Sequence, residues 1–422
     1  MLIRIFILFS VLASTPLIAT ATHAEKPLRV YVLAGQSNMV GTGAITSFGY
    51  IGEDPETAPL LEQMLADDGT PTVCDRVWIS SLNGKGAQYG GEGIGQLTAG
   101  YGFRRDDPTE LGDCIGPEYT FGISMQQVYD GPILLIKTAW GGRSLSVDYR
   151  PPGSGPYELN VTQIEKHTAR GDLDKVTAMK KEATGKNYRY MIDHVQKVLS
   201  DIQRVYPEYD PAVGYQLAGF VWFQGWNDYV DAGTYEVSRG EHQYDRYSQT
   251  LAQFIRDVRK DLNSPALPFV IGVMGTHGNF TPGTFNSRGD SEAKIKRFRA
   301  AMAAPAKMPE FEGNVVAVET APFNDAELGR INMKLEKVKQ FSRNLRKQNA
   351  SGNNGDNALN ADEIRDRVAN FREELISPDE ESLWERAAGH GGFVHYYGSA
   401  KFHAQTGKAF AEALRRLDEE KQ

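Results

Sequence analysis

Five short apolar segments constrain the fold of this 422-residue chain more than any other feature. Each segment is rich in β-branched or aromatic residues, and each is too short for an ordinary helix. The segments are 28–34, 132–138, 217–223, 268–274 and 315–319. Their apolar residues run on continuously instead of alternating with polar ones, which is typical of strands covered on both faces. The pattern therefore predicts a parallel sheet flanked by helices.

Stretches with helical periodicity lie between and after these segments. They are 118–128, 188–205, 244–262, 293–303, 328–345 and 399–417. Strands that alternate with helices predict the α/β class, here a three-layer α/β/α sandwich. In the last stretch Phe402, Phe410 and Leu414 share one face, so we expect this helix to pack against the sheet.

Two stretches depart from this alternation. Residues 149–186 begin with prolines and glycines and then become polar, and residues 349–381 begin with an Asn/Gly-rich run followed by charged helical sequence. Both are expected to be surface insertions into a single domain. The run 349–357 lacks the acidic spacing and the terminal glutamate of an EF-hand calcium loop, which favours a simple turn.

The amino terminus is typical of a secretory signal peptide. Residues 1–24 carry a positive charge, then an apolar run, then small residues. A membrane anchor is less favoured because the run is shorter than the ~20 residues that span a bilayer. We therefore expect an exported domain of residues 25–422, secreted or periplasmic, with no stable membrane insertion after cleavage.

Charge and cysteine content exclude some classes of protein. The chain has 46 Lys plus Arg against 54 Asp plus Glu, a net charge of −8, and no long basic cluster, which argues against a nucleic-acid partner. Cys74 and Cys114 are too few for a disulfide scaffold or a four-thiolate zinc site. They could form one disulfide or remain two buried thiols. The sequence does not indicate the oligomeric state.

A serine follows the first predicted strand directly. Gly35 and Gly41 on either side of Ser37 allow a tight turn that projects the hydroxyl from the carboxyl end of the strand, where open parallel sheets place their ligands. The spacing fits neither a P-loop nor a dinucleotide-binding loop. Ser37 is therefore a candidate nucleophile, and a helix N-cap serine is the alternative interpretation.

Polar or flexible residues also follow the next two strands and precede the last helix. The paired glycines Gly141 and Gly142 can bring backbone N–H groups close to an oxyanion, and Asn227 can donate from its side chain. Trp226 could stack on a sugar face. His395 lies in a glycine-bounded loop and is a candidate base, with a structural histidine as the alternative.

Together these segments resemble the SGNH hydrolase superfamily, most closely its sialate O-acetylesterase-like branch, which includes carbohydrate esterase family six. The similar blocks are 35–39, 116–118, 141–142, 222–225 and 395–401. The resemblance implies a five-stranded parallel, flavodoxin-like sheet. It also implies a serine esterase that needs no metal or organic cofactor and acts on acetylated carbohydrates.

The resemblance assigns roles to individual residues. Ser37 would be the nucleophile and His395 its general base. The oxyanion hole would consist of the Ser37 N–H, an N–H of Gly141 or Gly142, and the side chain of Asn227. Substrate-binding roles would fall to three further residues, Gln36, Gln224 and Trp226.

The acidic member of a catalytic triad is missing from its usual places. The position three residues before the histidine is Gly392, and the position after the Gln-Gly pair is Trp226. Asp228 is the first substitute, with Glu385 and Asp325 as weaker ones, and a Ser–His dyad is a further alternative. The same gap supports a second hypothesis, a carbohydrate-binding protein that has kept the fold and lost turnover. The sequence does not choose among sialic acid, xylan and other acetylated glycans.

Overall fold

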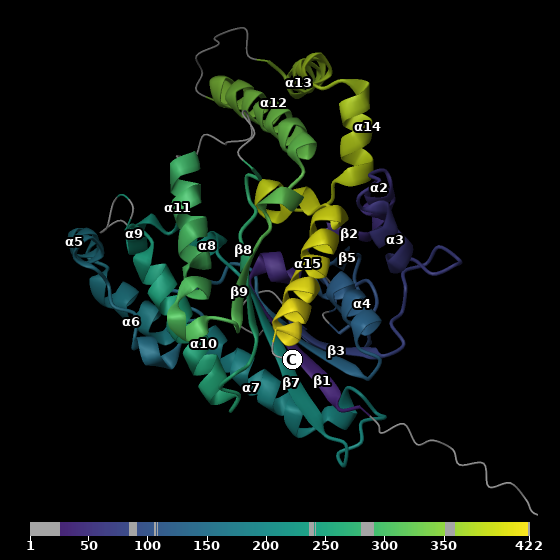
Figure 1. Ribbon diagram of the computed structural model, residues 1–422. Coiled ribbons are helices and arrows are strands. Elements are labelled where there is room, and N and C mark those ends of the chain that lie inside the picture. Colours follow the sequence, from purple (N-terminus) through teal and green to yellow (C-terminus); the bar gives the residue numbers. More distant parts are fainter. Residues whose placement is uncertain are drawn as a thin grey trace, which may run out of the picture.

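The computed structural model describes residues 26–83, 91–104, 107, 109–235, 240, 242–279, 291–350 and 359–420. The predicted signal peptide and most of the Asn/Gly-rich run lie outside these residues. A seven-stranded sheet with the order β4-β3-β6-β1-β7-β8-β9 forms the centre of the molecule (Figure 1). All five predicted strands are present, as β1 (Leu28–Gly35), β6 (Ile133–Ala139), β7 (Tyr215–Phe223), β8 (Phe269–Val273) and β9 (Val315–Glu319).

These five strands are mutually parallel and lie in the order β6-β1-β7-β8-β9. Numbered among themselves, this is the flavodoxin-like order 2-1-3-4-5. The predicted count of five is wrong for the whole sheet. β3 (Val77–Asn83) adds a parallel strand beside β6, and β4 (Glu92–Gln96) pairs antiparallel with β3 at the edge.

The sequence did not reveal β3 because two of its central residues are polar. Ser80 bonds Glu92 and His194, and Ser81 accepts hydrogen bonds from Arg104. These buried serines are satisfied only by side chains from other elements, so no local apolar pattern marks the strand.

Helices cover both faces of the sheet. The six predicted helices correspond to α4 (Glu118–Val128), α7 (Lys186–Ser200), α10 (Asp245–Asp261), α11 (Glu292–Ala303), α12 (Ala326–Ala350) and α15 (Ala400–Glu419). Alternate residues of β1 point to opposite faces, so Val32 packs with α7, α10 and α11, whereas Leu33 packs with α4 and α15. Phe402, Phe410 and Leu414 of α15 lie in this second core, which confirms the expected packing against the sheet.

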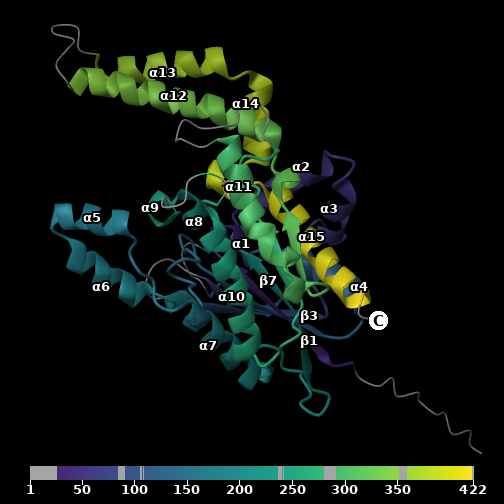
Figure 2. The ribbon, with the colours of Figure 1, turned by 60° about the vertical axis from the view of Figure 1, so that its left-hand side comes forward.

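The two stretches outside the alternation form helical arms. The first contains the hairpin of α5 (Val161–Arg170) and α6 (Leu173–Ala183), which has no buried residue. The second contains α13 (Ala361–Leu375) and α14 (Pro378–Ala387), which share a small core with α12. In Figure 2 the α5–α6 hairpin and the α12–α13 pair extend toward the same side of the molecule.

The remaining elements are short. They are α1 (Ser37–Val40), β2 (Gly43–Ala44), α2 (Phe48–Gly52), α3 (Ala58–Met64), β5 (Cys114–Ile115), α8 (Trp226–Val230) and α9 (Ala232–Tyr235), with a 3₁₀ segment over Phe393–Gly398. Cys74 and Cys114 are both buried and are not joined by a disulfide. In the described part of the chain no helix has the length and apolar character to cross a bilayer.

Candidate active site

Ser37 lies where β1 gives way to α1. A Cβ atom at Gly35 would lie 1.9 Å from the carbonyl oxygen of Phe223 on β7, so only glycine lets the two strand ends approach this closely. Ser37 is the first residue of α1, and the backbone N–H of a first helical residue is not used inside the helix. The turn therefore leaves both the Ser37 hydroxyl and its N–H beyond the carboxyl edge of the sheet.

Six of the predicted site residues line one pocket of 630 Å³ at this edge. The six are Ser37, Gly141, Gly142, Trp226, Asn227 and His395. They come from four segments that are far apart in the sequence. A Cβ atom at Gly141 would lie 3.8 Å from that of Ser37, which shows how closely the glycine turn approaches the serine.

His395 is held by its own loop. Its Nδ1 atom lies 3.2 Å from the carbonyl oxygen of Gly391. Burial lowers the pKa of His395 below its usual value, which favours the neutral imidazole that a base requires. Among the described residues no hydrogen bond joins His395 to Ser37, and such contacts often tighten only when substrate is bound.

Asp228 does not orient His395, which corrects the first choice for an acidic partner. The carboxylate is fully buried and accepts four hydrogen bonds, from Leu145 N (2.7 Å), Ser146 N (2.9 Å), Gln224 Nε2 (2.6 Å) and Tyr235 OH (2.7 Å). Burial raises its pKa against these four donors. Asp228 thus fastens the loop after β6 and Tyr235 of α9 to the start of α8, because the four donors occupy its oxygens.

Neither of the two weaker candidates for the acidic partner of His395 bonds its ring in the described structure. Asp325 accepts from the Tyr50 hydroxyl at 2.7 Å and from the first N–H groups of α12. Glu385 is an exposed residue of α14. Within the described structure no carboxylate bonds His395, and the Gly391 carbonyl occupies the place of the acid.

Gln36 and Gln224 are structural braces, which corrects their predicted substrate-binding role. Their exposed fractions are 1% and 0%. The Oε1 atom of Gln36 accepts from Gln224 Nε2 (3.1 Å), Gly225 N (3.2 Å) and Asn227 N (3.3 Å). These bonds tie the Ser37 turn to the loop after β7, and the Nε2 atom of Gln36 lies 3.5 Å from Ser37 Oγ. Burial keeps both side-chain amides out of contact with the pocket opening. Trp226 does line the pocket, with its ring edge-on to Phe393 at 5.5 Å.

Sequence reasoning missed several residues of the pocket. Thr42, Phe103, Arg104, His390 and Val394 belong to its wall, with Val40 and Gly391. Arg104 is 4% exposed and donates to the Ser81 carbonyl at 2.8 Å. No motif marks it, because its segment carries neither strand nor helix periodicity.

A fully buried ion pair that contacts the end of α1, the helix that begins at Ser37, was also not predicted. Lys137 Nζ donates to Glu118 Oε2 (2.6 Å), to the Val40 carbonyl (2.8 Å) and to the Tyr101 carbonyl (2.9 Å). Burial lowers the pKa of Lys137, and the Glu118 carboxylate opposes that shift. The only signal in the sequence was the block 116–118, which contains the glutamate but does not indicate its partner.

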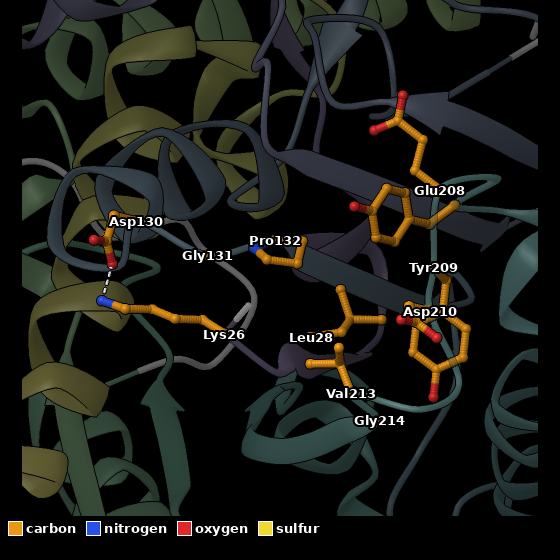
Figure 3. A pocket seen from close by; sticks show the side chains of 11 residues that line it. Lys26, Leu28, Asp130, Gly131, Pro132, Glu208, Tyr209, Asp210, Val213 and Gly214 are labelled. Atoms are coloured by element: carbon orange, nitrogen blue, oxygen red, sulfur yellow. Dashed lines mark hydrogen bonds and ion pairs between the residues drawn. The ribbon is translucent and has the colours of Figure 1, made fainter. Parts of the chain in front are cut away.

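Other features of the described residues do not suggest a competing centre. No cluster of three or more His, Cys, Asp or Glu side chains suited to a metal occurs among them. A second hollow of 360 Å³ lies at the opposite, amino-terminal edge of the sheet, with the ion pair of Lys26 and Asp130 on one side and Tyr209 on the other (Figure 3). Open parallel sheets place their ligands at the carboxyl edge, which favours the pocket at Ser37.

The sheet order and the position of the pocket define an SGNH-like α/β/α protein. Residues 103–309 match the family model described as carbohydrate esterase, sialic acid-specific acetylesterase. This match confirms the predicted resemblance over residues 103–309. The matched segment contains Gly141 and Asn227 but neither Ser37 nor His395, which the fold brings to the same pocket.

No curated protein matches the chain. Among solved structures, a protein from Arabidopsis thaliana aligns at 17% identity over 72% of this chain and 95% of its own, with a TM-score of 0.37. A novel carbohydrate acetylesterase from Xanthomonas citri aligns at 14% identity over 70% of this chain and 50% of its own, also with a TM-score of 0.37.

Proposed function

We propose that the chain is an exported serine esterase that removes O-acetyl groups from a carbohydrate through an acyl-enzyme on Ser37. One observation carries the proposal: Ser37, His395 and the oxyanion candidates Gly141 and Asn227 line a single pocket at the carboxyl edge of the sheet. These are the roles that ester hydrolysis requires, namely nucleophile, base and electrostatic stabiliser of the oxyanion.

The reaction would proceed in two halves. Neutral His395 takes the Ser37 proton as Oγ bonds to the ester carbonyl carbon, and the carbonyl π-electrons move onto oxygen. The oxyanion is held by the Ser37 and glycine N–H groups and by Asn227. Its collapse breaks the bond to the sugar oxygen, which receives the proton from His395. Water then repeats the sequence on the acetyl-enzyme and releases acetate.

The charge of the pocket favours an acidic sugar. Arg104 supplies a guanidinium group, and none of the described residues that line the pocket carries a carboxylate. Guanidinium groups bind carboxylates well, and Trp226 offers an aromatic face for a sugar ring. An acetylated sialic acid or another acetylated sugar acid fits these groups better than acetylated xylan.

Acetate release by purified protein tests the proposal. Wild type should hydrolyse a chromogenic acetyl ester and acetylated sugar acids, and Ser37→Ala should lose at least about a thousandfold in kcat/KM. Ser200→Ala is the control, since Ser200 is an exposed residue at the end of α7 whose hydroxyl donates to the Lys197 carbonyl. Equal turnover by wild type and Ser37→Ala across the panel would refute the esterase.

A catalytically impaired carbohydrate-binding protein is the second candidate. The observation that favours it is the lack of a carboxylate bonded to His395 in the described structure. In that case neither wild type nor Ser37→Ala would release acetate, and both would bind the glycan equally in calorimetry.

Export and domain organisation are part of the same proposal. Residues 1–24 would be removed as a signal peptide, and residues 25–422 would fold as one domain because Ser37 and His395 lie near its two ends. Amino-terminal sequencing of protein from the periplasm or medium should begin at Glu25, and an intact Met1 there would argue against cleavage.

A further inference from the structure

Thr42 connects three segments at the wall of the candidate active site. It lies two residues beyond α1, is 8% exposed and lines the pocket. Its hydroxyl donates to the backbone carbonyl of His395 at 3.3 Å, and its backbone N–H donates to Nε2 of His403 on α15 at 3.3 Å. One residue of the nucleophile turn thus holds the backbone of the candidate base.

His403 accepts the hydrogen bond from the Thr42 backbone N–H in a single protonation state. It is 1% exposed, and burial lowers its pKa to about 3, with the Lys137 ammonium and His395 acting in the same direction. The ring is therefore neutral at ordinary pH, and since Nε2 accepts from Thr42, the ring proton is on Nδ1. A neutral, buried acceptor keeps the Thr42 backbone in place across the pH range of an esterase.

The segment from Ser37 to Thr42 is also held by Lys137 and by Gly116. Lys137 holds the Val40 carbonyl at 2.8 Å, and a Cβ atom at Gly41 would lie 2.0 Å from the Cα atom of Gly116. The chain from Val40 to Thr42 is thus anchored at several points. Thr42 is where this anchored segment contacts the His395 backbone through a side chain.

His395 itself has few anchors. Its backbone N–H donates to the Gly392 carbonyl at 3.1 Å, and its ring bonds the Gly391 carbonyl, both within its own glycine-rich loop. Because no carboxylate among the described residues bonds the ring, its distance from Ser37 depends on the position of the loop. Two bonds fix this position relative to the Ser37 turn: the Thr42 hydroxyl bonds the His395 carbonyl, and the side chain of the next residue, Tyr396, is buried and hydrogen-bonded to Asn38. The Thr42 bond is the one made to His395 itself.

We propose that Thr42 is a positioning residue that helps to set the distance between His395 and Ser37. The inference rests on the proposed esterase function. It predicts that loss of the hydroxyl slows the chemical step and leaves substrate binding almost unchanged.

The test compares Thr42→Val with Thr42→Ser. Thr42→Val keeps the shape and removes the donor, so kcat should fall by about five- to tenfold while KM changes by less than about twofold. Thr42→Ser keeps the donor and should retain at least about half of the wild-type kcat. Should the valine variant fail to fold, Thr42→Ala removes the same donor without an added methyl group.

Thr120→Val provides the matched control. Thr120 is 0% exposed, and its hydroxyl donates to the Ala404 carbonyl on α15 at 2.7 Å, outside the pocket. This variant should lose stability to a similar degree in urea but keep its kcat.

Two outcomes would overturn the inference: an unchanged kcat in Thr42→Val, or equal losses in the valine and serine variants. Failure of the esterase itself would appear differently, as equal turnover by wild type and Ser37→Ala.

Discussion

The Nδ1 atom of His395 lies 3.2 Å from the carbonyl oxygen of Gly391 in the same loop. The acid of a Ser-His-Asp triad holds the imidazole in one tautomer and orientation, and it does not take the proton. A backbone carbonyl can perform the same task, although it carries no charge to stabilise the imidazolium. Under the proposed esterase function, the site would be a Ser–His dyad whose imidazole is oriented by the main chain.

Gly391→Ala should therefore reduce turnover. Gly391 has a φ of +126°, and a Cβ atom there would lie 2.7 Å from Cβ and 2.9 Å from Nδ1 of His395. The imidazole must move, and a misplacement of about 1 Å costs on the order of a hundredfold in rate. Steady-state kinetics check this, with Gly313→Ala as control because it is also at positive φ but has open space around it. Normal kcat in Gly391→Ala would contradict the assigned orientation.

The pH dependence of kcat/KM should show that His395 stays neutral at pH values below the usual histidine pKa. Burial lowers the pKa of His395 from 6.5, and no carboxylate in the described ranges opposes this shift. Below its folded-state pKa the ring is protonated and cannot accept the Ser37 proton, so activity falls as the pH falls through that value. The acid limb of kcat/KM is expected to have its midpoint below 6.5. A midpoint above the usual value would instead indicate a carboxylate partner.

Asn227→Ala tests the oxyanion hole. The side chain lines the pocket with Ser37, and its backbone N–H is fixed by Gln36 at 3.3 Å. Loss of one oxyanion donor typically lowers kcat by about 100- to 1,000-fold. Because the carbonyl oxygen gains its charge only in the transition state, KM should change little. Loss confined to KM would place Asn227 in ground-state binding instead.

Asp228→Asn separates a structural from a catalytic carboxylate. The amide would present N–H groups to a site that now accepts two backbone N–H bonds, so the free energy of unfolding should fall by about 2 to 4 kcal/mol. Urea unfolding measures this, and Asp257→Asn is the control because Asp257 also accepts a backbone N–H, from Gly153, but at a part-buried position outside the pocket. A stably folded variant with kcat reduced about 10⁴-fold would restore Asp228 to the catalytic triad.

The sequence by itself determined the main elements and the candidate nucleophile, base and oxyanion residues. Strands with continuous apolar runs are typically buried between two layers of helices. A glycine-flanked serine directly after such a strand is expected at the carboxyl edge of the sheet, where ligands bind. These are local patterns, and each can be read within about ten residues.

Only the tertiary structure decided what Asp228, Gln36 and Gln224 do. All three are buried beside the pocket-lining segments, and most of their polar atoms bond to donors and acceptors from other segments, such as Leu145 and Gly225. Bonds between distant segments also explain why the sequence did not predict β3, the Lys137–Glu118 ion pair or the bond from Thr42 to His395. Buried polar groups take partners that are distant in sequence, so their roles are fixed only when the chain has packed.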